Sequence, residues 1–195
     1  TTCLVGGIEN MTQAPHIVRG GRRGFRLGHG QLEDYLLAAL VDPYCGCYMA
    51  ETSNNLARDF GITREEQDRF ALQSQQRAAA AAAAGRLAAE IAPIEVGSGK
   101  KARTVEQDEH VRPDTTLEGL AKLPPAFDPN GFVTAGNASG IVDGAAMMIL
   151  TTEAHAKSKG WRMLGRLRGW SVVGVEPSRM GIGPAPAIRA VLGKL

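Results

Sequence analysis

Apolar positions recur with two different periods along this chain, and together they predict an α/β fold. Short apolar runs at Cys3 to Val5 and Ala145 to Leu150 indicate buried strands. Residues Gln31 to Leu40 and Met49 to Phe60 place apolar side chains at helical spacing. Met163 to Val175 predicts a long strand with a glycine at its middle. Strands and helices alternate at both ends around a large insertion, which is typical of α/β proteins.

The strongest helix signal begins at Thr63. Its hydroxyl and the side chain of Glu66 have the spacing of a capping box, in which each satisfies a backbone N–H of the other residue. The run Ala78 to Ala84 continues the helix, because alanine has the highest helix propensity. Gly85 suits the position just after the helix end.

The second half of the chain contains more irregular segments. Gln107 to Pro129 holds four prolines, which forbid long regular structure, and loops of this length are usually functional. Thr152 is placed to cap a helix from Glu153 to Lys159. A glycine loop at Met180 to Pro184 precedes a helix that begins near Pro186.

Composition narrows the class of protein. The 195 residues are 44% hydrophobic and 22% charged, which excludes a disordered chain. No stretch approaches the roughly 20 apolar residues of a membrane span, and a net charge of +2 favours neither a nucleic-acid nor a membrane partner. The chain has three cysteines: Cys45 and Cys47, which form a C-x-C motif, and Cys3. We expect reduced thiols in an intracellular protein, and no metal site, because there is no second cysteine pair to hold zinc.

Candidate chemistry is sparse, and the residues alone leave alternatives open. The four histidines are scattered and do not have the spacing of metal ligands. The sequence also contains no G-x-S-x-G motif, which would place a catalytic serine on a nucleophile elbow. Arg112, with the basic residues Lys100 to Arg103 before it, is suited to binding a phosphate or to forming a solvated surface. Asn137 and Ser139 either cap a helix or face a ligand. The basic segment Arg19 to Arg26 favours a surface loop or a subunit contact over nucleic-acid binding.

Five stretches, in order along the chain, resemble the thiolases. GGIENMTQAPH (6–16) is similar to the family's G-G-x-E-x-M-S-x-A-P-H, and FALQSQQR (70–77) to its loop-domain helix. The stretch 107–127 resembles the coenzyme A-binding loop, particularly that of degradative 3-ketoacyl-CoA thiolases. VTAGNASGIVDGAA (133–146) and MGIGPAPAI (180–188) resemble two further thiolase segments.

The resemblance implies a division of the chain and a set of ligand contacts. Residues 1–8 would be a strand of the N-terminal half, 9–132 an inserted loop domain that binds coenzyme A, 133–160 the return to that half, and 161–195 the start of the C-terminal half. Arg112, Thr115 and Ser139 would contact coenzyme A. The positions that would lie near the pantetheine and acyl tunnel are Leu40, Met49, Phe127, Ala135 and Met180.

The same resemblance implies an activity together with departures from it. The family thiolyses 3-ketoacyl-CoA, or runs the reverse condensation, with coenzyme A as substrate and no other cofactor. Its catalytic cysteine, asparagine, histidine and second-cysteine stretches have no match here, so we expect this chain to bind ligand without a catalytic residue of its own. Tyr48 stands where many relatives have histidine.

The expected partners are coenzyme A, acyl-CoA and further copies of the chain. The complete enzyme would be a dimer or tetramer in the cytoplasm or, in a eukaryote, in mitochondria or peroxisomes. Arg19 to Arg26 falls where thiolases form their tetramer-building loop. The alternative is a non-catalytic interaction protein or split subunit that needs a partner chain.

Overall fold

The computed structural model describes residues Thr2–Leu195, which divide into two compact units. Unit 1 consists of Thr1–Leu56 and Ile141–Leu195, and unit 2 of Ala57–Gly140. Helix α2 (Met49–Phe60), predicted with these bounds, contains the division. The four-part division expected from the thiolase resemblance concerns the family's domains and stays a prediction.

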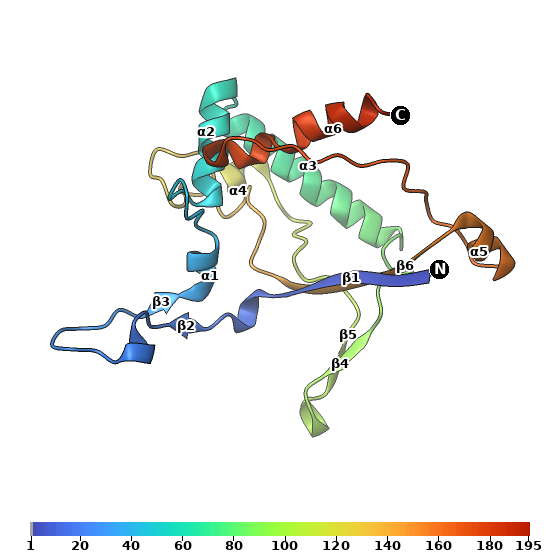
Figure 1. The fold of residues 1–195 in the computed structure, drawn as a ribbon, viewed down its shortest axis with the longest axis horizontal. Helices are drawn as coiled ribbons and strands as arrows, with labels where there is room; N and C mark the ends of the chain where they lie inside the picture. Colours follow the sequence, from blue (N-terminus) through green and yellow to red (C-terminus); the bar gives the residue numbers. More distant parts are fainter. Residues whose placement is uncertain (1) are drawn as a thin grey trace. The chain divides into compact units, whose positions relative to one another are not determined.

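The main strands of unit 1 form an antiparallel ribbon. Strands β1 (Thr2–Asn10) and β6 (Asp143–Thr151) pair along their whole length, and they lie side by side in Figure 1. Both are longer than the apolar runs that predicted them, because the pairing continues through the glycines and polar residues that flank those runs. Beyond the ribbon, the Thr12 backbone N–H donates to the Asp143 carboxylate at 3.0 Å and holds the chain against the first residue of β6.

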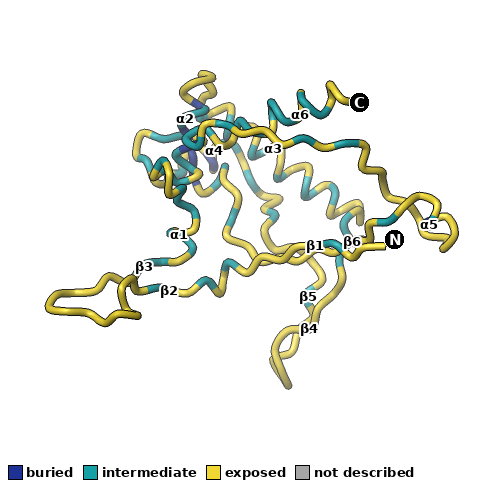
Figure 2. Tube along the Cα trace, in the orientation of Figure 1, coloured by how far each residue is buried: buried dark blue, intermediate teal, exposed yellow. Residues whose placement is uncertain are grey.

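The ribbon is exposed, so the expectation that its two apolar runs are buried is wrong. Leu4, Ile8, Met148 and Ile149 are each more than half exposed, and Figure 2 shows both strands mostly in yellow. A two-stranded ribbon leaves both faces open, and burial requires further strands or helices against them. Apolar character therefore predicted the strands correctly and their burial incorrectly.

Unit 1 continues with short elements between β1 and α2. After η1 (Met11–Gln13), β2 (His16–Ile17) pairs with β3 (Glu33–Asp34), and η2 (Gly21–Arg23) lies in the basic segment between them. Helix α1 covers only Tyr35–Ala39 of the predicted Gln31 to Leu40. The Asp34 carboxylate accepts the Leu36 N–H at 2.8 Å and fixes the start of the helix there.

The C-terminal part of unit 1 differs from its prediction in two places. Helix α5 (Glu153–Ser158) begins at the predicted Thr152 cap, but residues 162–176 carry no regular secondary structure. The predicted strand Met163 to Val175 is thus wrong for this chain, because an isolated segment with β-type residues needs a hydrogen-bonding neighbour to form a sheet. The predicted glycine loop, Met180 to Pro184, is not a separate loop. Its first residues belong to the 3-10 helix η4 (Pro177–Ile182), and its last residue begins helix α6 (Pro184–Leu192).

Unit 2 is organised by its long helix α3 (Arg64–Ala83). The predicted capping box is present: Thr63 N–H donates to Glu66 Oε2 at 2.7 Å, and Glu66 N–H donates to Thr63 Oγ1 at 3.2 Å. Gly85 follows the helix with φ of 69°, a left-handed conformation that glycine adopts without strain. The other elements are β4 (Ile94–Val96), η3 (Gly99–Lys101), β5 (Arg103–Val105) and α4 (Leu117–Ala121).

Few residues of unit 2 are buried, and several of them are polar. Leu120 and Val133 are the buried apolar residues between α4 and the segment that follows the proline-rich loop. Asp68 and Thr134 are buried with them and are hydrogen-bonded. No helix within Thr2–Leu195 combines the length and the apolar character that crossing a membrane requires.

Candidate functional site

Arg112 and Thr115 form one tight turn in the proline-rich loop. The Thr115 backbone N–H and hydroxyl both donate to the Arg112 carbonyl, at 3.2 and 2.7 Å. The Arg112 N–H donates to Oε1 of Gln75 on α3 at 2.9 Å, and the Thr116 hydroxyl caps α4 directly after the turn. The turn is therefore fixed between two helices, while Arg112 itself is exposed.

The Arg112 guanidinium has no ion-pair partner among the described residues. Other arginines of unit 2 form ion pairs with acidic residues of the same unit: Arg58 pairs with Asp128, and Arg64 pairs with Asp68. An exposed guanidinium on a fixed turn can bind a phosphate through paired, charge-assisted hydrogen bonds.

Ser139 and Ala135 lie on the segment that Asn137 holds in place. Asn137 Oδ1 accepts the Thr134 N–H at 2.7 Å, and its Nδ2 donates to the Phe132 carbonyl at 3.0 Å and to Asp68 Oδ1 at 2.9 Å. Thr134 is fully buried, whereas Ser139 and Ala135 are exposed on either side of Asn137. The segment thus presents a hydroxyl and a small apolar residue to solvent from a rigid base.

Two glycines allow this segment to approach its neighbours closely. A Cβ on Gly136 would lie 2.5 Å from side-chain atoms of both Leu120 and Leu123, so a larger residue would require both leucines to shift. The imidazole of His110 packs against Gly140 in the same way. His110 belongs to the loop that carries Arg112, so the loop of Arg112 and the segment of Ser139 are neighbours within unit 2.

Phe127 occupies a strained turn at the end of the proline-rich loop. Its φ is 66°, which is rare for a bulky residue, and the Asp128 N–H donates to the Ala126 carbonyl across it at 2.8 Å. Asp128 then accepts Arg58 Nη2 at 2.7 Å, which lowers the pKa of the Asp128 carboxyl. Phe127 is 57% exposed.

The other predicted tunnel residues belong to unit 1. Leu40 ends α1, and its N–H donates to the Leu36 and Leu37 carbonyls. Met49 begins α2, and Met180 lies on η4, which is tied to α2 by Asn55 Nδ2 donating to the Ser178 carbonyl at 3.1 Å. Met49 and Met180 are each nearly half exposed.

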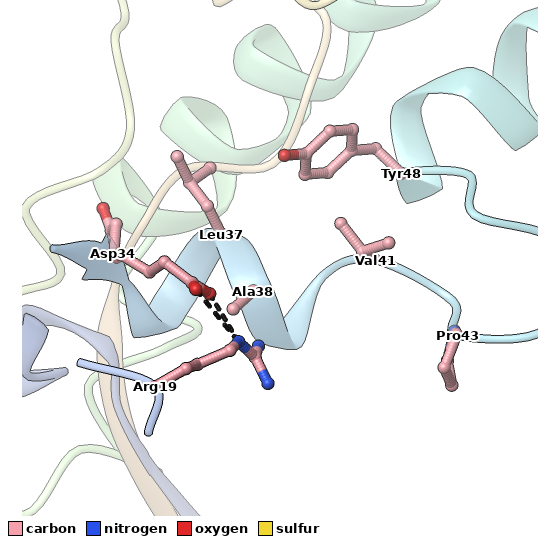
Figure 3. Close-up of a pocket in the computed structure, with 8 residues that line it drawn as sticks. Arg19, Asp34, Leu37, Ala38, Val41, Pro43 and Tyr48 are labelled. Carbon is pink, nitrogen blue, oxygen red and sulfur yellow. Dashed lines mark hydrogen bonds and ion pairs between the residues drawn. The ribbon is translucent and has the colours of Figure 1, made fainter. Parts of the chain in front are cut away.

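Two cavities were not predicted from the sequence. One, of about 450 Å³, lies in unit 1 and is lined by residues of α1 together with Arg19 and Tyr48 (Figure 3). At this cavity Arg19 Nε donates to both carboxylate oxygens of Glu33, at 3.0 and 2.9 Å. The other, of about 520 Å³, lies in unit 2 and includes Leu87 and Val111, the neighbour of Arg112. None of the eight predicted ligand contacts lines either cavity.

The residues that position the site were partly missed. The sequence singled out Asn137, but not Gln75 or Asp68, which are polar residues in an exposed-looking helix. There was little reason in the sequence to select Gln75 and Asp68, because both lie on α3 and such residues are common on the exposed faces of helices. Within Thr2–Leu195 no three histidine, cysteine or acidic side chains gather closely enough to hold a metal ion.

Comparison with known proteins identifies the family of this chain. The sequence model of the thiolase N-terminal domain matches residues 1–154. The chain belongs to the thiolase family. It is similar to human mitochondrial 3-ketoacyl-CoA thiolase, with 50% identity over 98% of this chain and 48% of that protein. It is 47% identical to the acetyl-CoA acetyltransferase of Rhizobium meliloti, again over 98% of this chain and 49% of that protein.

Solved thiolase structures confirm the predicted fold. The crystal structure of human mitochondrial 3-ketoacyl-CoA thiolase in complex with CoA superposes with a TM-score of 0.91 over 99% of this chain and 48% of that one. The Bacillus anthracis acetyl-CoA acetyltransferase gives a TM-score of 0.93 at 44% identity. The chain spans about half the length of the thiolases it matches.

Proposed function

We propose that this chain forms the coenzyme A- and acyl-CoA-binding portion of a thiolase, an acetyl-CoA C-acyltransferase. The complete enzyme would thiolyse 3-ketoacyl-CoA or catalyse the reverse condensation. The observation that carries the proposal is the exposed Arg112 guanidinium on a turn that Gln75 and Thr115 hold, beside the segment of Ser139. The human relative with 50% identity was solved with CoA bound, which supports the same ligand here.

The proposed ligand contacts divide by chemistry. Arg112 supplies a cation for a phosphate of coenzyme A, and Thr115 and Ser139 supply hydroxyl groups that donate or accept hydrogen bonds. The apolar residues suit the thin pantetheine arm and the acyl chain; they are Leu40, Met49, Phe127, Ala135 and Met180.

The proposed role of this chain is to position ligand, without supplying the nucleophile. In the family a cysteine thiolate attacks the substrate and splits one difficult step into two. Cys3, Cys45 and Cys47 stand in stretches unlike those of the family's catalytic cysteines. The three thiols are free, which fits an intracellular location.

We also propose that the chain works with further copies of itself, as a dimer or tetramer. Exposed apolar residues cover both strands of the β1–β6 ribbon, including Leu4, Ile8 and Ile149. Soluble proteins rarely leave such surface uncovered. Light scattering over a range of concentrations tests this, and a monomer at every concentration would contradict it.

Titration calorimetry with coenzyme A tests the ligand proposal on this chain. Arg112→Ala should weaken binding by roughly 5- to 150-fold, because a charge-assisted hydrogen bond is worth roughly 1–3 kcal/mol. Arg69→Ala removes an arginine that pairs with Glu65 on the surface of α3, and should bind coenzyme A like the parent. Equal affinity of the Arg112→Ala variant and the parent would remove Arg112 from the site.

A further inference from the structure

The loop before α2 brings two cysteines into one closed turn. The backbone N–H of Asp42 donates to the Cys47 carbonyl at 2.9 Å, and Gly46 N–H donates to the Asp42 carbonyl at 2.8 Å. The Asp42 carboxylate also accepts the N–H groups of Tyr44 and Cys45, at 2.8 and 2.9 Å. Asp42 therefore fixes both ends of a turn that contains Cys45, Gly46 and Cys47.

The chain bends sharply between the two cysteines. Gly46 has φ of 69°, in the left-handed region, so the chain reverses between the two cysteines. The Cys47 thiol folds back toward Cys45 and donates to its carbonyl at 3.6 Å. Cα atoms two residues apart are separated by at most about 7 Å, and a bend between them brings that distance toward the roughly 4.4–6.8 Å that disulfides span.

Solvent can reach the pair. Cys45 and Cys47 are both partly exposed, and Tyr44 before them is 84% exposed. A cysteine that an oxidant can reach, with a second cysteine beside it, has the arrangement of a reversible redox pair. A mixed disulfide formed on either thiol would be resolved by the other, because the turn is already closed.

We infer that Cys45 and Cys47 form a reversible dithiol/disulfide site that reacts with small-molecule disulfides. One cysteine thiolate attacks a sulfur of glutathione disulfide, forming a mixed disulfide and releasing one glutathione thiolate. The second cysteine thiolate attacks the protein sulfur of that mixed disulfide and releases the second glutathione thiolate. The protein loses two electrons, glutathione disulfide gains them, and the two cysteine protons pass to the released thiolates.

The surroundings of the pair set its pH dependence. The side chain of Cys45, desolvation, and the charges of Glu51 and Asp42 all raise the pKa of the Cys47 thiol. Cys47 is then mostly a protonated thiol at neutral pH, and only a thiolate attacks a disulfide. Ring closure should become faster as the pH rises from neutral to mildly alkaline.

Incubation of the whole chain in glutathione redox buffers tests the inference, with thiol blocking and peptide mass spectrometry as the readout. The parent and Cys3→Ser should both form a disulfide within the peptide that holds Cys45 and Cys47, and excess reduced glutathione should reopen it. Cys45→Ser and Cys47→Ser should each lose it and retain glutathione on the remaining cysteine of the turn. Two separate glutathione adducts in the parent, two unreacted thiols, or a bridge to Cys3 would each overturn the inference.

Discussion

Asn137 donates its side-chain amide to Oδ1 of Asp68 across 2.9 Å, and this bond joins the N-terminal part of α3 to the segment that carries Ser139. The other carboxylate oxygen of Asp68 accepts Arg64 Nε at 2.8 Å. Arg64 in turn donates to the carbonyls of Leu120 and Leu123, at 2.8 and 3.0 Å. One buried carboxylate therefore organises α3, the end of α4 and the proposed ligand segment.

Removal of this carboxylate should destabilise unit 2. Asp68 is 2% exposed, so Asp68→Ala removes a buried carboxylate that both Arg64 and Asn137 use as a hydrogen-bond partner. We expect a loss of about 3 kcal/mol in the free energy of unfolding. Urea titration followed by far-ultraviolet circular dichroism measures it, because α3 is the longest helix among the described residues.

Glu65→Ala is the matched control for Asp68→Ala. Glu65 pairs with Arg69 four residues later on the same helix, but both side chains are more than 60% exposed. Such a pair contributes about 0.3–0.5 kcal/mol. Equal destabilisation by the two substitutions would show that the buried network is not the organising contact.

The capping box of α3 gives a second prediction. Thr63→Ala removes the hydroxyl that accepts the Glu66 N–H and should cost about 1 kcal/mol in the free energy of unfolding. Thr63→Ser keeps an accepting hydroxyl and should cost much less. The same urea titration compares them, and a serine variant as unstable as the alanine variant would contradict a capping role.

Local signals explain which parts of the fold the sequence could predict. Capping at Thr63 and Thr152, the left-handed Gly85 and the bounds of α2 depend on neighbouring residues, and all are confirmed. The predicted strand at Met163 to Val175 is absent because strand formation depends on a partner that lies far away in sequence or in another chain.

Parts of the site were beyond sequence reasoning for the same reason. The contact of Gln75 with the Arg112 backbone joins residues 37 positions apart, and that of Asp68 with Asn137 spans 69 positions. No spacing rule connects such pairs. Asn137 was identified because a polar residue between small ones needs partners, but the identity of those partners required the structure.

Acid should weaken the contact that holds the Phe127 turn. The Arg58 hydrogen bond, and then the Asn130 N–H, lower the pKa of Asp128 below its ordinary value of 3.8. Because the pKa is lower in the folded state, the contact stabilises the folded protein fully at pH values above the ordinary pKa of 3.8. This stabilisation is lost as the pH falls through the lower, folded-state pKa. Asp128→Asn should therefore be less stable than the parent at neutral pH, and the difference should shrink in acid.

Thermal unfolding of both proteins across this pH range measures that difference. The comparison with Asp128→Asn is needed because Asp42, Glu66, Asp143 and Glu153 also have lowered pKa values and contribute to the acid slope of the parent. A stability difference that stays constant from neutral pH into acid would mean that the charge of Asp128 does not stabilise the turn.

Phe127 gives a prediction that separates stability from ligand binding. A bulky residue in the left-handed region costs of order 1–3 kcal/mol, and the ring is mostly exposed, so it recovers little of this by burial. Phe127→Gly should raise the free energy of unfolding by about 1 kcal/mol, because glycine adopts this φ without strain. Phe127→Ala also removes the ring but keeps the Cβ in the strained conformation, and should gain no stability.

If Phe127 lines the proposed acyl tunnel, both variants should bind a long-chain acyl-CoA more weakly than the parent while binding coenzyme A itself almost unchanged. The ring would then be kept for the apolar contact it makes with the acyl chain, at a cost in stability that the Arg58–Asp128 contact helps to offset. Urea titration and calorimetry on the two variants measure the two effects independently. A glycine variant that is less stable than the alanine variant would refute the strain, and unchanged acyl-CoA affinity in both would remove Phe127 from the tunnel.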